Sequence, residues 1–174
     1  SVASPPAVHS IRPPGGTPPA VILVDHGSPV RDVTRVRNHL AVQLRARLGD
    51  AVRGVLAASM ERRPESEYSF NEPLLERAFD QPGFHAGTVI VALLFLSPGR
   101  HAGPDGDVAQ ICAAAGQRHP KLQTVISAPV GSHPELIPIL VDRVRAGLTL
   151  PPLQIPWQPP PVPAPGPERG RLLQ

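Results

Sequence analysis

The sequence predicts an α/β fold in which helices cover both faces of a four-stranded parallel sheet. Short apolar runs alternate along the chain with segments of helical periodicity, and such alternation is typical of a parallel sheet with right-handed crossover helices. The 174 residues suffice for one domain with its own core. Aromatic residues make up only 3% of the chain, so the core must be built from Val, Leu, Ile and Ala, which favours a tightly packed α/β sandwich.

Four apolar segments are predicted to form the strands of this sheet. The first ends at Asp25 and is followed at once by a His-Gly-Ser turn, which is how a buried parallel strand ends. The third, with the sequence TVIVALLFL, has the strongest strand pattern in the chain. The predicted strands are residues 20–25, 52–58, 88–96 and 122–128.

Four other segments have the periodicity of helices. The first carries a stripe of Val and Leu residues and stops at Gly49, a residue type favoured just beyond the end of a helix. The second is predicted to begin with Asn71 as its cap and Pro73 in its first turn. The predicted helices are residues 29–48, 72–79, 104–115 and 134–146.

The two ends of the chain differ in composition from the part between them. Residues 1–19 contain six prolines, residues 151–174 contain nine, and neither end has apolar periodicity. We therefore predict one domain over residues 20–147, flanked by proline-rich disordered arms over residues 1–19 and 148–174.

Charge, hydropathy and cysteine content exclude several classes of protein. The net charge is +3 and the basic residues do not cluster, so no nucleic-acid interface is predicted. No apolar run approaches the ~18 residues of a transmembrane helix, and the N-terminus lacks the pattern of a signal peptide. The single cysteine, Cys112, allows no disulfide within the chain, so we expect a reducing compartment, by default the cytoplasm. Its position on the apolar side of a predicted helix places Cys112 in the core.

Three side chains that can bind a metal follow three of the predicted strands. His26 comes directly after the first strand, Glu61 follows the second, and His101 follows the third. In a parallel sheet the carboxyl ends of the strands meet at one edge, where ligands bind. Two imidazoles and a carboxylate suit an open site for a divalent ion such as Co²⁺, Fe²⁺, Ni²⁺ or Zn²⁺. The sequence therefore predicts a metal site formed by His26, His101 and Glu61.

The segments around these residues resemble a known family. VILVDHGS, ASMERRPE and FLSPGRHAGPDGDV, in this order within residues 20–147, are similar to the small class II (CbiX/SirB-like) sirohydrochlorin chelatases. The resemblance implies a flavodoxin-like unit that pairs as a homodimer, with active sites in clefts near the interface. It also implies two substrates, a sirohydrochlorin-type tetrapyrrole and a divalent metal for cobalamin or sirohaem synthesis. Co²⁺ is favoured, Fe²⁺ and Ni²⁺ are the alternatives, and no organic cofactor is expected.

The resemblance also implies roles for individual residues. His26 and His101 would bind the metal and accept pyrrole N–H protons, because a neutral imidazole is available near physiological pH. Glu61 would complete the site or relay protons. Arginines and turn residues at the same edge would bind the carboxylates of the tetrapyrrole. The predicted substrate-binding residues are Ser28, Arg62, Arg63, Ser97, Gly99 and Arg100.

Several alternatives stay open at this point. Glu65 is a credible substitute for Glu61, and either Asp105 or Asp107 could serve the site or simply cap the helix that follows. The same fold could belong to a metal or tetrapyrrole carrier without catalytic activity. A histidine phosphatase is less compatible, because the first strand ends in Asp-His-Gly instead of Arg-His-Gly. No glycine-rich nucleotide-binding motif is present.

Overall fold

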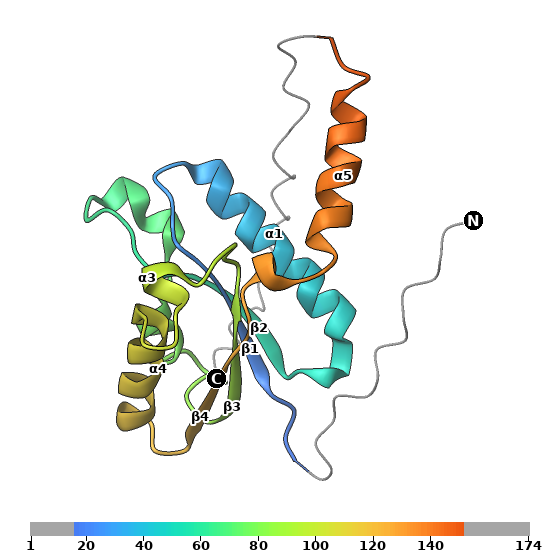
Figure 1. The fold of residues 1–174 in the computed structure, drawn as a ribbon. Helices are drawn as coiled ribbons and strands as arrows, with labels where there is room; N and C mark the ends of the chain where they lie inside the picture. The colour runs from blue at the N-terminus through green and yellow to red at the C-terminus, as the bar shows by residue number, and fades with distance from the viewer. Residues whose placement is uncertain (1–15, 152–174) are drawn as a thin grey trace, which may run out of the picture.

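A computed structural model describes residues 16–151 of the chain. Its centre is a four-stranded, entirely parallel sheet in the order β2-β1-β3-β4 (Figure 1). This order corresponds to the first four strands of the flavodoxin-like order 2-1-3-4-5, and it confirms the predicted α/β class. The strands are β1 (Ala20–Asp25), β2 (Gly54–Ser59), β3 (Gly87–Leu93) and β4 (Leu122–Ile126).

Helices lie on both faces of the sheet, as predicted: α1 is on one face and α4 on the other (Figure 1). The α-helices are α1 (Arg31–Leu48), α2 (Leu75–Ala78), α3 (Gly99–Ala102), α4 (Asp107–Arg118) and α5 (Leu136–Gly147). Short 3₁₀ helices are η1 (Gly49–Ala51), η2 (Ser66–Asn71) and η3 (Val130–Ser132). Among residues 16–151, no helix has the length and apolar character to cross a membrane. The proline-rich arms predicted at the two ends lie mostly outside the described residues.

The main core lies between the sheet and helices α2 and α4. Alternate residues of each strand face this side, so that Ile22 and Val91 pair in register and pack with Phe79 of the α2 segment and Val108 of α4. All four side chains are buried. Burying one such side chain stabilises the fold by about 1.5–3 kcal/mol, and this aliphatic core is the kind that the composition predicts.

Cys112 belongs to the same core and is buried, as predicted. Burial raises the pKa of its thiol from 9.0 to about 11, although a hydrogen bond with Thr124 opposes the rise. Between these values the unfolded chain loses a proton that the folded chain keeps, so stability falls as the pH rises through this window.

We expect Cys112→Ala to remove up to about 1.4 kcal/mol per pH unit of that alkaline loss of stability. Urea unfolding of the wild type and of Cys112→Ala at several pH values measures this difference. If the free energy of unfolding fell equally with pH in both proteins, the expectation would be contradicted.

Helix α1 covers only half of the opposite face. It packs over β1 and β2, where Val21, Leu23 and Ala41 are buried. Over β3 and β4 the same face is bare: Ile90 pairs in register with Val125, and Val125 is 50% exposed. Helix α5, which follows β4, extends away from the sheet (Figure 1) and has no buried residue.

The segment between β2 and β3 differs most from the sequence prediction. A helix was expected over residues 72–79, but α2 spans Leu75–Ala78 and is preceded by η2. Asn71 does not cap α2. Its buried side chain accepts hydrogen bonds from Ser28 N–H (3.1 Å) and Thr34 Oγ1 (2.9 Å). The cap residue that the local pattern indicates is therefore used to join distant parts of the chain.

Candidate metal and tetrapyrrole site

His26 lies between two other candidate ligands at the carboxyl edge of the sheet. β1 is flanked by β2 and β3, so the loop after β1 sits between Glu61, which follows β2, and His101, which lies on the short helix α3. The Nε2 atom of His26 is 3.1 Å from Nε2 of His101 and 3.6 Å from Oε1 of Glu61. The structure therefore brings together the three residues that the sequence placed at separate strand ends.

The backbone fixes two of these ligands relative to each other. The amides of Met60 and Glu61 donate hydrogen bonds to the carbonyl oxygens of Asp25 (2.9 Å) and His26 (3.1 Å). Gly27 has φ +97°, and a Cβ atom there would lie 2.0 Å from the carbonyl oxygen of Glu61. Only glycine fits this conformation and this close approach. The His26-Gly27 turn therefore determines how closely the loop after β1 approaches the loop after β2.

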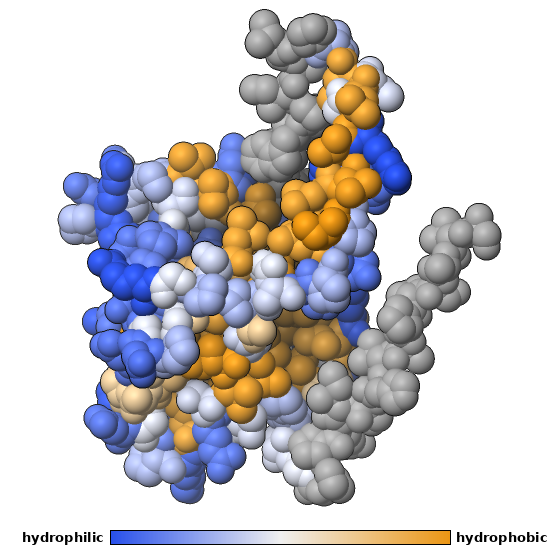
Figure 2. All heavy atoms as spheres, viewed as in Figure 1, coloured by the Kyte–Doolittle hydropathy of each residue, from blue (hydrophilic) through white to orange (hydrophobic). Residues whose placement is uncertain are grey.

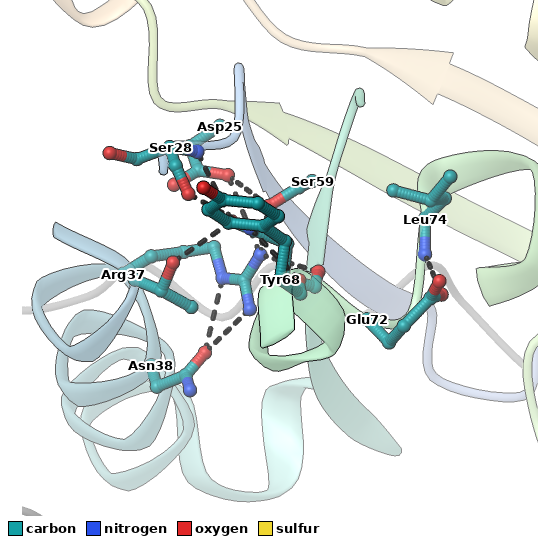
Figure 3. A network of polar contacts seen from close by, with 10 residues as sticks. Asp25, Ser28, Arg37, Asn38, Ser59, Tyr68, Glu72 and Leu74 are labelled. Atoms are coloured by element: carbon teal, nitrogen blue, oxygen red, sulfur yellow. Dashed lines mark hydrogen bonds and ion pairs between the residues drawn. The ribbon is translucent and has the colours of Figure 1, made fainter. Parts of the chain in front are cut away.

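A buried arginine supports both loops from below (Figure 3). Arg37 of α1 is 1% exposed; it donates hydrogen bonds to Ser59 Oγ, to the carbonyl of Asn71 (3.2 Å) and to Oδ1 of Asn38 (2.9 Å). Its guanidinium is 3.5 Å from Asp25, and Ser59 Oγ donates to the same carboxylate at 2.7 Å. Burial lowers the pKa of Arg37 and the charge of Asp25 opposes that shift. The network joins α1, β1, β2 and η2 directly beneath the candidate ligands.

Asp107, the first residue of α4, orients His101. Its Oδ2 atom is 2.6 Å from Nδ1 of the imidazole. An ionised carboxylate only accepts hydrogen bonds, so Nδ1 carries the proton and the lone pair of Nε2 is left for a metal or a proton. Arg100 Nε lies 3.8 Å from the same oxygen. Of the two aspartates left open by the sequence, Asp107 thus contacts the candidate site, whereas the carbonyl of Asp105 accepts a hydrogen bond from Gln110.

The distances from His26 are compatible with ligands of one metal ion. Two nitrogens 3.1 Å apart, each about 2.1 Å from an ion, subtend about 95° at that ion. A nitrogen and an oxygen 3.6 Å apart subtend about 118° with similar bond lengths. Within residues 16–151 no group of three or more His, Cys, Asp or Glu side chains is already arranged to hold a metal. Binding one ion with all three residues therefore requires their side chains to adjust.

A cavity of about 290 Å³ opens beside His26 and Glu61. Three of the predicted substrate-binding residues, Ser28, Arg62 and Arg63, contribute to its wall. Ser97, Gly99 and Arg100 are exposed on and before α3, on the side of His101. The full lining is His26, Gly27, Ser28, Pro29, Glu61, Arg62 and Arg63.

Several of these groups already have partners within the protein. The N–H of Ser28 donates to Asn71, and its Oγ accepts from the amide of Val30 at 3.0 Å. Arg62 Nε is 2.6 Å from Glu72, whose pKa it lowers by hydrogen bonding. The backbone N–H of Ser28 and the Nε of Arg62 therefore cannot bind a substrate carboxylate without exchanging a partner, whereas the Ser28 hydroxyl, which here accepts a hydrogen bond, can still donate one.

Arg63 contributes to the wall of the cavity and contacts Tyr68. Its guanidinium is 5.2 Å from the centre of the Tyr68 ring and donates to the Tyr68 hydroxyl at 3.1 Å. Glu65, the alternative to Glu61, is exposed and precedes η2, where its carbonyl accepts from the amide of Tyr68. Glu65 is not part of the cavity wall, so Glu61 is the carboxylate adjacent to the histidines.

Comparison with known proteins gives two matches. The family model described as CbiX matches residues 20–146. A protein of Arabidopsis thaliana named sirohydrochlorin ferrochelatase, chloroplastic, is 29% identical over 133 residues, which cover 75% of this chain and 53% of that relative. The chain thus spans about half the length of the curated relative it matches. Because the family model covers most of the chain, from β1 into the last turn of α5, the protein belongs to the CbiX family.

Proposed function

We propose that this protein is a sirohydrochlorin chelatase, a lyase-class enzyme that inserts a divalent metal into a tetrapyrrole. The observation that carries the proposal is the approach of His101 and Glu61 to His26 at the carboxyl edge of the sheet, 3.1 and 3.6 Å from its Nε2 atom. Membership of the CbiX family and the name of the Arabidopsis relative support the same activity. The domain that performs it is proposed to be residues 20–147.

The chemistry requires a base as well as a metal ligand. A divalent ion enters the macrocycle only as two pyrrole N–H protons leave. The Nε2 lone pair of His101 can accept one of them, and Asp107 stabilises the resulting imidazolium through Nδ1. His26 and Glu61 hold the incoming ion and replace part of its water shell. The second pyrrole proton leaves through Glu61, which is largely exposed and passes it to solvent.

The substrate is larger than the cavity. Sirohydrochlorin, in the chemistry of the family, is a macrocycle with eight carboxylates, whereas the cavity measures about 290 Å³. We therefore propose that one edge of the macrocycle enters beside His26, with the rest lying over the surface. We propose that Arg63 and Arg100 pair with its carboxylates, and that Arg62 joins them by exchanging its present partner Glu72.

The identity of the metal is a separate question. Two imidazoles and a carboxylate accept Co²⁺, Fe²⁺ and Ni²⁺ alike. Co²⁺ is the ion favoured by the sequence analysis, whereas the name of the Arabidopsis relative favours iron. The homodimer and the cytoplasmic location likewise stay predictions.

Visible absorbance of sirohydrochlorin, followed with Co²⁺, Fe²⁺ and Ni²⁺ in parallel and under anaerobic conditions for iron, tests the proposal and ranks the metals. Rates that rise in proportion to protein concentration support it. Rates equal to the spontaneous reaction with every metal would refute it.

Asp107→Asn tests the positioning of His101. The amide can keep a contact with the imidazole but carries no charge to hold its orientation and stabilise the imidazolium, and loss of such supporting partners costs about 10–100-fold in metal affinity or activity. We expect kcat to fall by that factor with little change in KM for the tetrapyrrole. The matched control is Asp105→Asn, two residues away and outside the contact with His101, which should retain full activity. Equal losses in both variants would contradict the assigned role.

A further inference from the structure

We propose that Arg63, Tyr68, Phe70 and Arg31 form a row beside the candidate cavity, and that the two guanidinium groups of this row bind carboxylates of the tetrapyrrole. The row adds Arg31 to the substrate-binding residues already named, and it gives a role to the two aromatic side chains of η2. The inference rests on the proposed function, because it takes sirohydrochlorin as the ligand.

The four side chains of the row contact one another in turn. The guanidinium of Arg63 lies over the Tyr68 ring, 5.2 Å from its centre, and the centres of the Tyr68 and Phe70 rings are 6.2 Å apart. The guanidinium of Arg31, the first residue of α1, lies over the Phe70 ring at 4.5 Å. Both cations are within the ~6 Å at which the face of a ring attracts a cation, so each arginine is positioned by an aromatic side chain.

The two arginines of the row have no carboxylate partner in the described part of the chain. No ion pair among residues 16–151 includes Arg31 or Arg63, and Asp32, which follows Arg31, pairs with Arg35 at 2.6 Å. Arg63 donates one hydrogen bond to the Tyr68 hydroxyl (3.1 Å), which leaves other N–H donors of its guanidinium free. An aromatic ring holds a guanidinium without neutralising it. Both groups can therefore bind a carboxylate through two parallel hydrogen bonds.

The buried side chain of Asn71 fixes the row relative to the cavity. Its amide nitrogen donates to the carbonyl oxygens of Ser28 (2.9 Å) and Tyr68 (3.2 Å), and its Oδ1 atom accepts from Thr34 Oγ1 of α1 (2.9 Å). Figure 3 shows Ser28 and Tyr68 in this polar network. Asn71 thus joins η2, which carries both rings, to the loop after β1 and to the helix that carries Arg31. A site whose groups are already held in place loses less conformational freedom when a ligand binds.

The row borders the candidate cavity. Arg63 and Ser28 contribute to the cavity wall, as does Pro29, which precedes Arg31 by two residues. Figure 2 shows that the surface around α3 is mainly hydrophilic, whereas apolar residues gather over α5. A macrocycle with carboxylates around its rim therefore fits this edge of the sheet better than the surface of α5.

The position of the row also explains how the macrocycle would be centred. The loop that carries His26 lies between the loop of Arg63 and the helix α3, because β1 is flanked by β2 and β3. Arg100 of α3, whose side chain is 80% exposed, stands on the far side of His26. Carboxylates bound by the row at one edge of the macrocycle and by Arg100 at another place its central nitrogens over His26.

Binding of metal-free sirohydrochlorin, measured by equilibrium dialysis, tests the row without requiring turnover. We expect Arg31→Gln to raise the dissociation constant about tenfold or more, because a hydrogen-bonded contact between charged groups is lost. The difference should shrink as salt is added, since salt screens exposed charges. In the insertion assay KM for the tetrapyrrole should rise by the same factor while kcat stays unchanged.

Arg47→Gln is the matched control for this substitution. Arg47 is also exposed and lies on α1, but at the end of the helix opposite to Arg31. Its dissociation constant and KM should equal those of the wild type at every salt concentration.

A second test asks whether Phe70 acts through Arg31. Phe70→Leu keeps an apolar side chain but removes the ring under the guanidinium, so it should weaken binding severalfold. In a chain that already carries Arg31→Gln it should have no further effect, because the group that the ring positions is gone. Phe84→Leu is the control, since Phe84 is likewise partly buried but packs against the main core, and it should leave binding unchanged. Circular dichroism checks that each variant is folded.

The outcomes separate this inference from the proposed function. Equal binding by Arg31→Gln and Arg47→Gln, or additive losses for Arg31→Gln and Phe70→Leu, would overturn the row even if the wild type metallates sirohydrochlorin. A wild type that binds sirohydrochlorin without turnover, and loses that binding in Arg31→Gln, would support the row and refute the chelatase. A wild type that does not bind sirohydrochlorin at all would refute both.

Discussion

Replacing His101 by Ala is expected to abolish catalysed metal insertion. The variant loses the proposed base, whose Nε2 atom lies 3.1 Å from His26, and a positioned base alone contributes about 10²–10⁴-fold to a rate. We expect kcat to fall by at least that factor, to the level of the spontaneous reaction. Continuous absorbance assays with saturating metal and tetrapyrrole measure the loss.

His133→Ala is the matched control for this substitution. His133 also follows a strand at the carboxyl edge, but it is exposed beside η3, and its Nδ1 atom only accepts the amide of Glu135 at 3.2 Å. Its removal should leave insertion unchanged. If His101→Ala kept wild-type activity, or if both variants lost activity equally, the assignment of the base would be wrong.

Replacing Arg37 by Met is expected to cause the largest loss of stability. The substitution keeps much of the side-chain volume but leaves Asp25, which is 8% exposed, as a charge without its buried partner. Breaking a buried ion pair by removing one member costs about 3–5 kcal/mol. Urea unfolding monitored by circular dichroism should show that decrease, and activity should fall as well because the loops that carry His26 and Glu61 rest on this network.

Arg35→Met provides the comparison on the same helix. Arg35 pairs with Asp32 at 2.6 Å, but both side chains are 40% exposed, and such surface pairs contribute about 0–1 kcal/mol. A decrease for Arg37→Met no larger than that for Arg35→Met would show that the buried network does not support the fold in the way we describe.

The strands and their parallel direction were accessible from the sequence because they depend on local pattern and on one rule of connection. The wholly apolar run that ends at Asp25 is β1 with the predicted bounds, and the parallel topology then placed His26, Glu61 and His101 at one edge. The second helix was wrong because Asn71, read as a cap, hydrogen-bonds with Ser28 and Thr34 instead. Such long-range use of a cap residue leaves no local signal.

The supporting residues of the site could not be predicted for a similar reason. Arg37 stands between Val36 and Asn38 on α1, which carries four other arginines, and nothing in the pattern distinguishes Arg37 as the buried one. Its only signal is that Thr34 and Ala41, at helical spacing, are small. The contact of Asp107 with His101 could not be predicted either, because it depends on where α3 ends and α4 begins. These two boundaries bring Oδ2 of Asp107 to 2.6 Å from Nδ1 of His101.

The pattern of α5 predicted a helix with one apolar side, and the structure confirms the helix. Periodicity shows that such a side needs a partner, but not which surface provides it.

We propose that His26, His101 and Glu61, at the carboxyl edge of the sheet, catalyse the insertion of a metal ion into sirohydrochlorin. The most direct test counts products per protein molecule in an insertion assay with protein far below the concentrations of sirohydrochlorin and metal. The account predicts many metallated products per chain, formed faster than without protein and with a rate that saturates in both substrates. Binding of metal or tetrapyrrole with no more than one product per chain would contradict it and would identify the protein as a carrier.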